Sequence, residues 1–501
     1  MTIRFIRAIL APAAMLSVAA CAELEVTNPN NPDIARALAT PADVAKIAKS
    51  SVNSWWLVST HHEPYMMLQV TADAGTANFG NFGMRFNNLE PRIAYNNNSA
   101  GGDAQATVRP WDFNFGALGA ANDALRAIAG GIVIPGADGT DKARAAAIFA
   151  QAGSLTNLAL LFDKAFVVTE ATDLSKAPEL VPYTAVRDSA LRKWDALITL
   201  TQGKTWSWDG DVIPLSVPQT AVNINRIANT MAARTLMLSA RTGAENTATN
   251  WARVLSYADK GITGTGLADI NFGIIGDGVN IWYSNLVNYG NLDSWTRADQ
   301  RLINRMAPNV PAKYAGTLVV PVTTDRRLGV ANLPCTGAGQ PNACLTGVTT
   351  DYVYLATVLG DPARGIFMQS PYYHRRWRDV SFAVPDASQA GRFIPYVIAA
   401  ENDLMIAEAL VRSNGDLTRA ATLVNKTRVT RGGLDPVAAN TAALLAAISY
   451  ERDVELLNTN GLSLFDGRRL EQLQAGTFRQ LPIPAKELET LALPIYTFGG
   501  P

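Results

Sequence analysis

Two stretches of the chain combine aromatic side chains with Asn, Asp and Arg, a mixture that suits sugar recognition. Aromatic rings can stack on the C–H faces of pyranoses, and polar side chains can satisfy hydroxyl groups that lose water on binding. The alternative is that such aromatics form small cores beneath long loops. The candidate ligand-binding residues are Asp73, Asn78, Phe82, Arg85 and Tyr95 in the first stretch, and Trp282, Tyr283, Tyr289, Trp295 and Arg297 in the second.

Three adjacent residues, His61, His62 and Glu63, raise the question of a metal site. Neighbouring histidines point in different directions on a helix or strand, and no third ligand follows at a recognised spacing. The only other histidine is His374. No zinc site is therefore expected. A structural Ca²⁺ ion stays open, because oxygen ligands from loops such as that of Asp293 leave no fixed pattern.

Acidic and basic residues near the C-terminus have the spacing of a structural network. Glu451 and Glu455 are one helical turn apart, with Arg452 between them and Asp466 and Arg468 beyond. Residues at i and i+4 share a helix face, so ion pairs that tie the last helices together are predicted. A Gly-x-Ser-x-Gly elbow, a phosphate loop and a dinucleotide fingerprint are missing from the sequence. No catalysis is expected.

Other aromatic groups have different predicted roles. Trp206 and Trp208 alternate in a predicted strand or turn with exposed rings, which favours a second stacking site or a partner contact. Trp55 and Trp56 at the end of a predicted helix are expected in the core. The basic and aromatic cluster at residues 372–378 is interpreted as a contact to a partner or to an acidic ligand.

The N-terminus has the features of an export signal that ends at a lipidation site. Arg4 and Arg7 precede an apolar run that is too short to span a bilayer comfortably, and small residues stand directly before Cys21. Residues 1–20 are therefore predicted as a lipoprotein signal peptide, Cys21 as the lipidated first residue of the mature protein, and residues 21–39 as its tether. The alternative is an ordinary signal peptide followed by a chance cysteine.

The two remaining cysteines, Cys335 and Cys344, lie in a segment rich in Gly, Pro and Asn. A local disulfide is expected there in an exported protein, in preference to a metal site or a nucleophile. Two thiols without a nearby histidine make a poor zinc site.

Charge balance excludes several classes of function. The 501 residues include 43 Lys and Arg against 43 Asp and Glu, so no global field attracts nucleic acid or an acidic membrane surface. No stretch after the signal reaches the roughly 18 apolar residues that a membrane helix needs, so the lipid is the expected membrane attachment. Because the net charge is zero and the chain carries Asn and Trp residues, an uncharged sugar is favoured as the ligand.

The elements that must position these residues are predicted almost entirely as helices. Thr40 supplies an N-cap hydroxyl and Pro41 follows at the first helical position. Residues 61–110 and 261–395 lack helical periodicity and are expected as irregular regions that carry function. Further helices are expected over residues 111–128, 141–169, 183–200, 223–239, 249–260, 396–412, 416–429 and 442–457.

Pairs of these helices indicate a degenerate repeat of the tetratricopeptide type. The clearest pair is residues 398–411 with 418–429, and a second is residues 227–239 with 251–260. Helices of about 12–17 residues with short turns are typical of such repeats.

Three segments near the C-terminus resemble the signature of the SusD/RagB family of nutrient-binding outer-membrane lipoproteins. They are residues 396–410, residues 450–469 and residues 481–487 with its Leu-Pro-Ile-Pro. Thr40-Pro41, the Asp73 segment and Trp111 also match the layout of the family. Asn458 and Asn460 stand where an aromatic and an acidic residue are common in the family, so glycan specificity is not transferred.

The resemblance implies an all-α fold in which tetratricopeptide-like helix pairs carry a large irregular, loop-rich ligand-binding region. One body is expected from residue 40 to 501, with signature helices at 396–501. The implied function is capture of an oligosaccharide nutrient at the cell surface and its delivery to a SusC-type TonB-dependent channel in the outer membrane. No enzymatic activity, cofactor or nucleic-acid partner is expected. A non-binding scaffold or lid of the channel, and a peptide-binding member, remain the alternatives.

Overall fold

The computed structural model describes residue 38 and residues 40–501, apart from 265, 278–280, 293, 331–349, 378–390 and 461. The predictions for Cys21, for Cys335 with Cys344, and for Asp293 therefore lie outside the described residues. Within the described ranges helices dominate, and the strands form two-stranded pairs. None of the described helices combines the length and apolar character that crossing a membrane requires.

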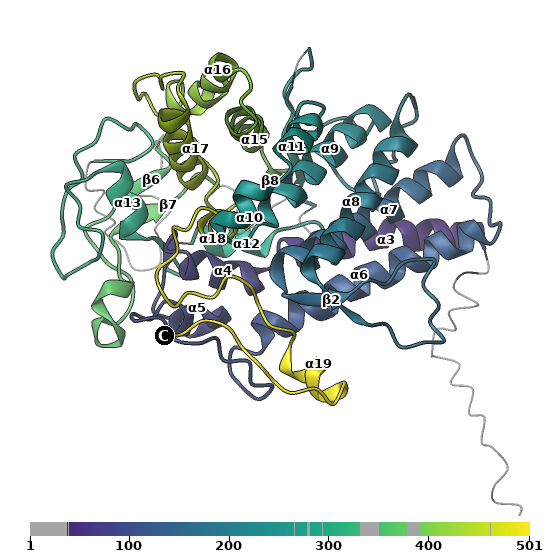
Figure 1. The fold of residues 1–501 in the computed structure, drawn as a ribbon, viewed down its shortest axis with the longest axis horizontal. Helices are drawn as coiled ribbons and strands as arrows, with labels where there is room; N and C mark the ends of the chain where they lie inside the picture. The colour runs from purple at the N-terminus through teal and green to yellow at the C-terminus, as the bar shows by residue number, and fades with distance from the viewer. Residues whose placement is uncertain are drawn as a thin grey trace, which may run out of the picture.

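Long helices pack side by side across most of the molecule (Figure 1). Helix α7 packs against α6 and α8, α9 against α8 and α11, and α15 continues the row with α16 and α17. These elements are α3 (Pro41–Ser59), α6 (Gln105–Ala129), α7 (Gly139–Leu161), α8 (Tyr183–Thr201), α9 (Ala221–Leu238), α11 (Trp251–Ala258), α15 (Ala399–Arg412), α16 (Leu417–Arg428) and α17 (Thr441–Glu455).

The predicted start of the first helix and both predicted helix pairs are confirmed. The hydroxyl of Thr40 accepts the Asp43 N–H at 3.2 Å and Pro41 opens α3. Both predicted pairs, α15 with α16 and α9 with α11, pack against each other. The carboxylate of Asp416 caps α16 by accepting the Arg419 N–H at 2.9 Å. The fold is thus an all-α scaffold with tetratricopeptide-like pairs.

Two predicted helix boundaries are wrong because strands replace the ends. The helix predicted to run to residue 169 ends at Leu161, and the chain continues into β2 (Lys164–Phe166), which pairs with β3 (Leu180–Pro182). The helix predicted from residue 396 starts at Ala399, because the preceding residues belong to β8 (Phe393–Val397) and pair with β4 (Phe272–Ile275).

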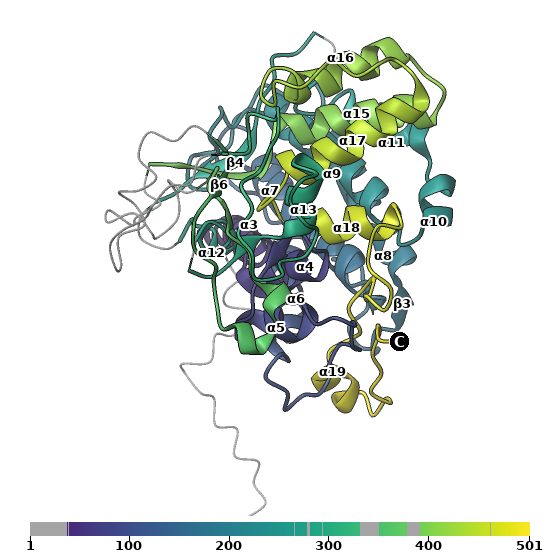
Figure 2. The ribbon, with the colours of Figure 1, turned by 90° about the vertical axis from the view of Figure 1, so that its left-hand side faces the viewer.

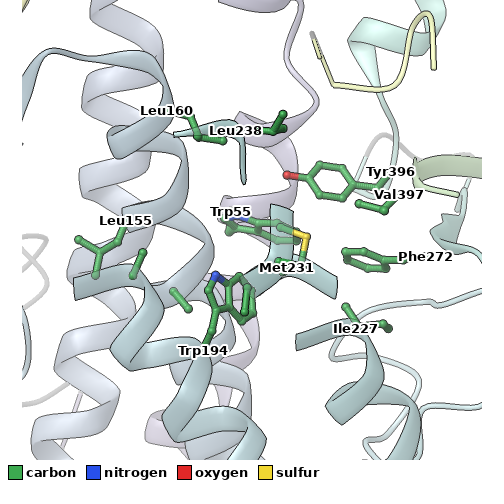
Figure 3. Close-up of a cluster of buried hydrophobic side chains, with 14 of the residues drawn as sticks. Trp55, Leu155, Leu160, Trp194, Ile227, Met231, Leu238, Phe272, Tyr396 and Val397 are labelled. Carbon is green, nitrogen blue, oxygen red and sulfur yellow. The ribbon is translucent and has the colours of Figure 1, made fainter. Parts of the chain in front are cut away.

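Figure 3 shows a part of the main hydrophobic core in which side chains of α3, α7, α8 and α9 meet those of the β4–β8 pair. The ring of Trp55 is fully buried and meets Phe149 edge-on at 5.0 Å and Tyr396 at 5.2 Å between ring centroids. Trp56 is also fully buried. The prediction that both tryptophans belong to the core is confirmed, and the buried area of such large rings stabilises the packing of distant segments.

The predicted exposure of Trp206 and Trp208 is wrong. Both side chains are buried, and the indole N–H of Trp208 donates to the Lys142 carbonyl at 3.0 Å. Alternation of two tryptophans in a turn gives no information on what packs against them, and here α7 packs against Trp208 through Lys142 and Phe149.

The regions predicted as irregular contain short elements. Helix α4 spans the start of the first region, and α6 begins six residues before the predicted Trp111. Residues 63–71 of α4 are buried on all sides, so the segment has no amphipathic period to reveal it. The remaining elements are α4 (His62–Thr71), η2 (Asn81–Gly83), α5 (Met84–Asn87), α10 (Gly243–Ala248), α12 (Asn285–Gly290), α13 (Gln300–Met306), β6 (Tyr352–Tyr354), η3 (Pro362–Arg364), η4 (Ile366–Met368), β7 (Tyr372–His374), α18 (Leu462–Arg469) and α19 (Ala485–Thr490).

A short strand pair joins the two irregular regions. Strand β1 (Gly75–Thr76) runs antiparallel to β5 (Arg297–Ala298). In addition, the indole N–H of Trp56 donates to the Tyr283 carbonyl at 2.7 Å, which ties the end of α3 to the segment before α12. Figure 2 shows α12 close to α4, and the two helices are in contact. Segments far apart in the sequence therefore meet at one place.

The predicted ion pairs near the C-terminus are structural. Arg452 donates from Nε to both carboxylate oxygens of Asp466, at 3.0 and 2.9 Å, and so joins α17 to α18. Glu451 and Glu455 each accept from the buried Arg327 at 2.7 Å. Charges removed from water in this way need close partners, and these residues supply them.

Candidate ligand-binding site

Six aromatic side chains gather where the two irregular regions meet, and we call this cluster the aromatic platform. It comprises His61, His62, Phe82, Phe113, Tyr289 and Trp295. All six are partly or fully exposed, and Phe113 keeps 48% of its surface accessible. Aromatic rings that remain accessible to solvent can receive the C–H face of a sugar.

Four of the rings form a column. Trp295 stacks on Phe82 with centroids 5.3 Å apart and planes at 15°. Phe82 is followed by His62 at 4.0 Å, and His62 by His61 at 4.0 Å. Tyr289 stands edge-on beside Trp295 at 4.9 Å. The faces of the inner rings are covered by their neighbours, whereas Trp295 ends the column and is partly exposed, so it is the candidate ring for stacking on a sugar.

The backbone holds Phe82 in an unusual conformation. Its φ of 59° lies in the left-handed region, which disfavours residues other than glycine, and Gly83 follows with a φ of 70°. Residues held in such conformations cost on the order of 1 kcal/mol or more and persist where surrounding contacts fix them. The rings of His62 and Trp295 supply those contacts on both sides of Phe82.

Asn458 connects α4 and α12, the helices that carry His62 and Tyr289 of the platform, a role that sequence reasoning did not assign. Its side chain accepts from Gln69 of α4 at 2.8 Å and donates to the Gly290 carbonyl of α12 at 2.7 Å. Asn458 adopts a left-handed φ of 61°, which Asn tolerates better than most residues. At this position, where the sequence departs from the family pattern, the buried side chain of Asn458 therefore links α4 to α12.

The histidines of the platform are neutral at physiological pH. Burial, together with the positive charge of Arg109, lowers the pKa of His61 to about 4. Burial and the neighbouring ring of His61 lower the pKa of His62 to about 3. Burial raises the pKa of Glu63, while Arg109 opposes this with its Nη1 at 3.1 Å from the carboxylate.

The donor atoms of His61, His62 and Glu63 lie within 4.8 Å of one another, yet this set does not suit a metal ion. Nδ1 of His61 accepts the Glu63 N–H at 3.1 Å and caps α4. The proton of the neutral ring must then be on Nε2, which leaves His61 no lone pair for a cation. The guanidinium of Arg109 already lies beside the Glu63 carboxylate.

Phe82, Tyr289 and Trp295 are the predicted ligand-binding residues that the structure brings together in the platform. Tyr283 and Arg85 are partly exposed, and the Nε of Arg85 has no hydrogen-bond partner among the described residues. Sequence reasoning did not assign His61, His62 and Phe113 to the ligand site. The signal available in the sequence was the pair His61-His62 shortly after Trp55 and Trp56, and this pair was interpreted only as a candidate metal motif.

The other five predicted residues are buried in structural roles. Asn78 donates to the Asp361 carbonyl at 2.9 Å, and the hydroxyl of Tyr95 donates to the Asp103 carbonyl at 3.0 Å. Trp282 belongs to the main core. Arg297 donates to the Thr357 carbonyl at 3.3 Å, and Asp73 accepts from two arginines, Arg92 at 2.5 Å and Arg301 at 2.8 Å.

A buried acid beside Asp73 gives a testable pH dependence. Asp299 caps α13 by accepting the Arg301 N–H at 2.8 Å, and its burial, reinforced by the charge of Asp73, raises its pKa. An acid with a raised pKa in the folded state contributes stability at low pH that is lost as the pH rises above its unfolded pKa of about 4. Asp299→Asn keeps the cap and cannot ionise, so its free energy of unfolding should fall less between pH 5 and pH 8 than that of the wild type.

Urea unfolding at the two pH values measures this difference. Asp416→Asn, at an exposed cap of the same type on α16, is the matched control and should follow the wild-type pH profile. An Asp299→Asn protein with the wild-type pH profile would contradict the prediction.

No protein-family model and no curated protein sequence matches the chain. Solved structures do match. A SusD superfamily protein from Parabacteroides distasonis has a TM-score of 0.59 at 14% identity, covering 89% of this chain and 97% of its own. The surface glycan-binding protein A from Bacteroides thetaiotaomicron has a TM-score of 0.57 at 13% identity, covering 92% and 99%. A SusD-like carbohydrate binding protein from Bacteroides fragilis has a TM-score of 0.56 at 14% identity, covering 87% of each chain.

These matches extend over most of the chain and over most of each solved structure. The chain has the SusD-like fold. At 13–14% identity the similarity concerns the scaffold, so the ligand must be argued from the residues of this chain.

Proposed function

We propose that this protein is a SusD-like lipoprotein of the outer membrane that binds an oligosaccharide on the aromatic platform and delivers it to a SusC-type TonB-dependent channel. The observation that carries the proposal is the ring column, which ends on the partly exposed Trp295. The SusD-like fold supports it, since structural neighbours include proteins described as glycan-binding and carbohydrate-binding. The lipidation pattern at Cys21 supports attachment through lipid.

The proposed role is binding without catalysis. Glycoside hydrolysis needs two carboxyl groups roughly 5–10 Å apart at the scissile bond. Among the described residues that touch the platform through a ring contact, hydrogen bond or ion pair, Glu63 is the one carboxylate, and Arg109 lies against it. This arrangement suits retention of a sugar better than its cleavage.

Substitution of Trp295 tests the binding site. Trp295→Ala is expected to weaken the binding of glycans found in an array screen at least about tenfold, equivalent to about 1.4 kcal/mol, because the stacking face is lost. Trp295→Phe keeps a ring and should retain most of the affinity. Isothermal titration calorimetry gives the affinities, and thermal unfolding shows whether each variant is folded.

Phe498→Ala is the control for loss of a partly exposed ring outside the platform, and it should bind as the wild type does. Unchanged affinity in a folded Trp295→Ala protein would contradict the assignment of the binding site to the platform. A wild-type protein that binds peptides and no glycan would contradict the proposal that the ligand is a sugar. Delivery is tested separately, since Trp295→Ala should impair uptake of the glycan when the channel is intact, whereas a non-binding lid would not need Trp295.

A further inference from the structure

Two hydrogen-bond donors meet at the end of the ring column opposite Trp295. The first belongs to His61, whose Nδ1 accepts the Glu63 N–H at 3.1 Å. Since the ring is neutral and Nδ1 is the acceptor, Nε2 carries the proton and can only donate. The second donor is Nη1 of Arg109, which lies 3.5 Å from Nε2 of His61.

These two N–H groups cannot satisfy each other, because both donate. Arg109 is held in place by a hydrogen bond from its Nε to Gln105 at 3.3 Å and by the charge of Glu63. The carboxylate oxygen of Glu63 lies 3.1 Å from Nη1 but makes no hydrogen bond there. The side chain of Arg109 keeps 38% of its surface accessible.

The neighbouring ring of Phe113 gives the pair of donors an apolar side. It stands edge-on to His61 at 6.1 Å and is 48% exposed. A ligand that binds here therefore contacts the ring of Phe113 and, next to it, the two donors of His61 and Arg109. The donor on Arg109 carries a positive charge. An acceptor group with two oxygens and a negative charge matches such a pair better than a hydroxyl, because charge-assisted hydrogen bonds are shorter and about twice as strong.

We propose that the His61 end of the platform recognises the carboxylate of a uronic acid residue, with Arg109 and His61 as the donors. This inference rests on the proposed function, because it assumes that a glycan occupies the platform. It names the class of glycan as acidic, in contrast to the uncharged sugar that the overall charge balance favours. The ligand carboxylate would share the guanidinium of Arg109 with Glu63.

The decisive comparison uses ligands that differ only in the charge of the carboxyl group. Oligogalacturonides and unsulfated chondroitin oligosaccharides are each titrated as the free acid and as the methyl ester. We expect the acid to bind at least tenfold more tightly than its ester to the wild type. Arg109→Gln should weaken binding of the acid at least tenfold and leave the ester nearly unchanged.

Two further variants serve as controls. Arg144→Gln removes the same charge from α7 near the α6–α7 turn, at the other end of α6 from Arg109, and should keep the preference for the acid. His61→Asn retains an N-cap acceptor for α4 but moves the donor away, so it should lose part of the preference while remaining folded.

The outcomes separate this inference from the proposed function. Equal affinity for the acid and its ester would overturn the proposal of a uronic acid, and so would binding of a neutral glycan alone. If the binding still depends on Trp295 in either case, the proposed function stands. Binding of sulfated but not of unsulfated chondroitin oligosaccharides would also overturn the proposal that the carboxylate is the recognised group. Absence of any glycan binding would overturn both.

Discussion

Glu408→Ala is expected to lower the free energy of unfolding by about 3–5 kcal/mol, because the buried Arg469 loses one of its two carboxylate partners and keeps only Asp466. Glu408 of α15 and Arg469 of α18 are both essentially inaccessible to solvent. Arg469 donates to the two oxygens of Glu408 through two nitrogens, each at 2.7 Å. A buried pair with two parallel hydrogen bonds is costly to break, because the arginine stays buried after its partner is lost.

Urea unfolding of Glu408→Ala should be compared with that of Asp211→Ala. Asp211 pairs with Lys49 at 2.7 Å but is 65% exposed, so its removal should cost no more than about 1 kcal/mol. Similar losses in the two variants would contradict the assignment of Glu408 to a buried structural pair.

The same pair predicts acid sensitivity. Burial alone would raise the pKa of Glu408, but the guanidinium of Arg469 holds it at about 2. A group with a lowered folded pKa contributes stability above its unfolded pKa, and that contribution is lost as the pH falls through the folded value. The wild type should therefore lose this contribution to stability between about pH 4 and pH 2, whereas Glu408→Ala should not.

Gly153→Ala is expected to lower the free energy of unfolding by about 2–3 kcal/mol, although alanine is the better helix former. Gly153 lies inside α7, and a Cβ added there would be 2.2 Å from Nε1 of Trp55. The indole cannot move aside, because Phe149 and Tyr396 already pack against it at 5.0 and 5.2 Å between ring centroids. Overpacking of the core thus outweighs the gain in helix propensity.

Gly116→Ala is the matched control in the neighbouring helix. A Cβ added to Gly116 of α6 meets no atom within 4 Å, and the residue is exposed. This substitution should raise the free energy of unfolding by about 0.5–1 kcal/mol through helix propensity and reduced entropy of the unfolded chain. Opposite signs in one urea-unfolding experiment are the expected result, and a neutral or stabilising Gly153→Ala would contradict the prediction.

Net charge gave little guidance to the chemistry of the platform. The chain as a whole is neutral, which favours an uncharged ligand. Locally, the donor pair of Arg109 and His61 favours an anion, because the cap that His61 forms on α4 determines which of its nitrogens donates. Composition sums over the surface, whereas recognition depends on the few atoms that face the ligand.

Local signals account for what the sequence by itself determined. The cap and proline at Thr40 and Pro41, the helix pair α15–α16 and the pairing of Arg452 with Asp466 all depend on residues close together in the chain. The core positions of Trp55 and Trp56 also followed from their place at the end of an amphipathic helix. Periodicity and capping act within a few turns, so the scaffold could be predicted.

Only the tertiary structure decided which candidates meet at the site. Phe82, Tyr289 and Trp295 become neighbours because β1 pairs with β5 and Asn458 joins α4 to α12. Tertiary contacts also bury Asp73, Asn78, Tyr95, Trp282 and Arg297, whose residue types alone are equally suited to a sugar. The side-chain composition of a loop shows what it could bind, but its exposure depends on the segments that pack against it, and these come from distant parts of the chain.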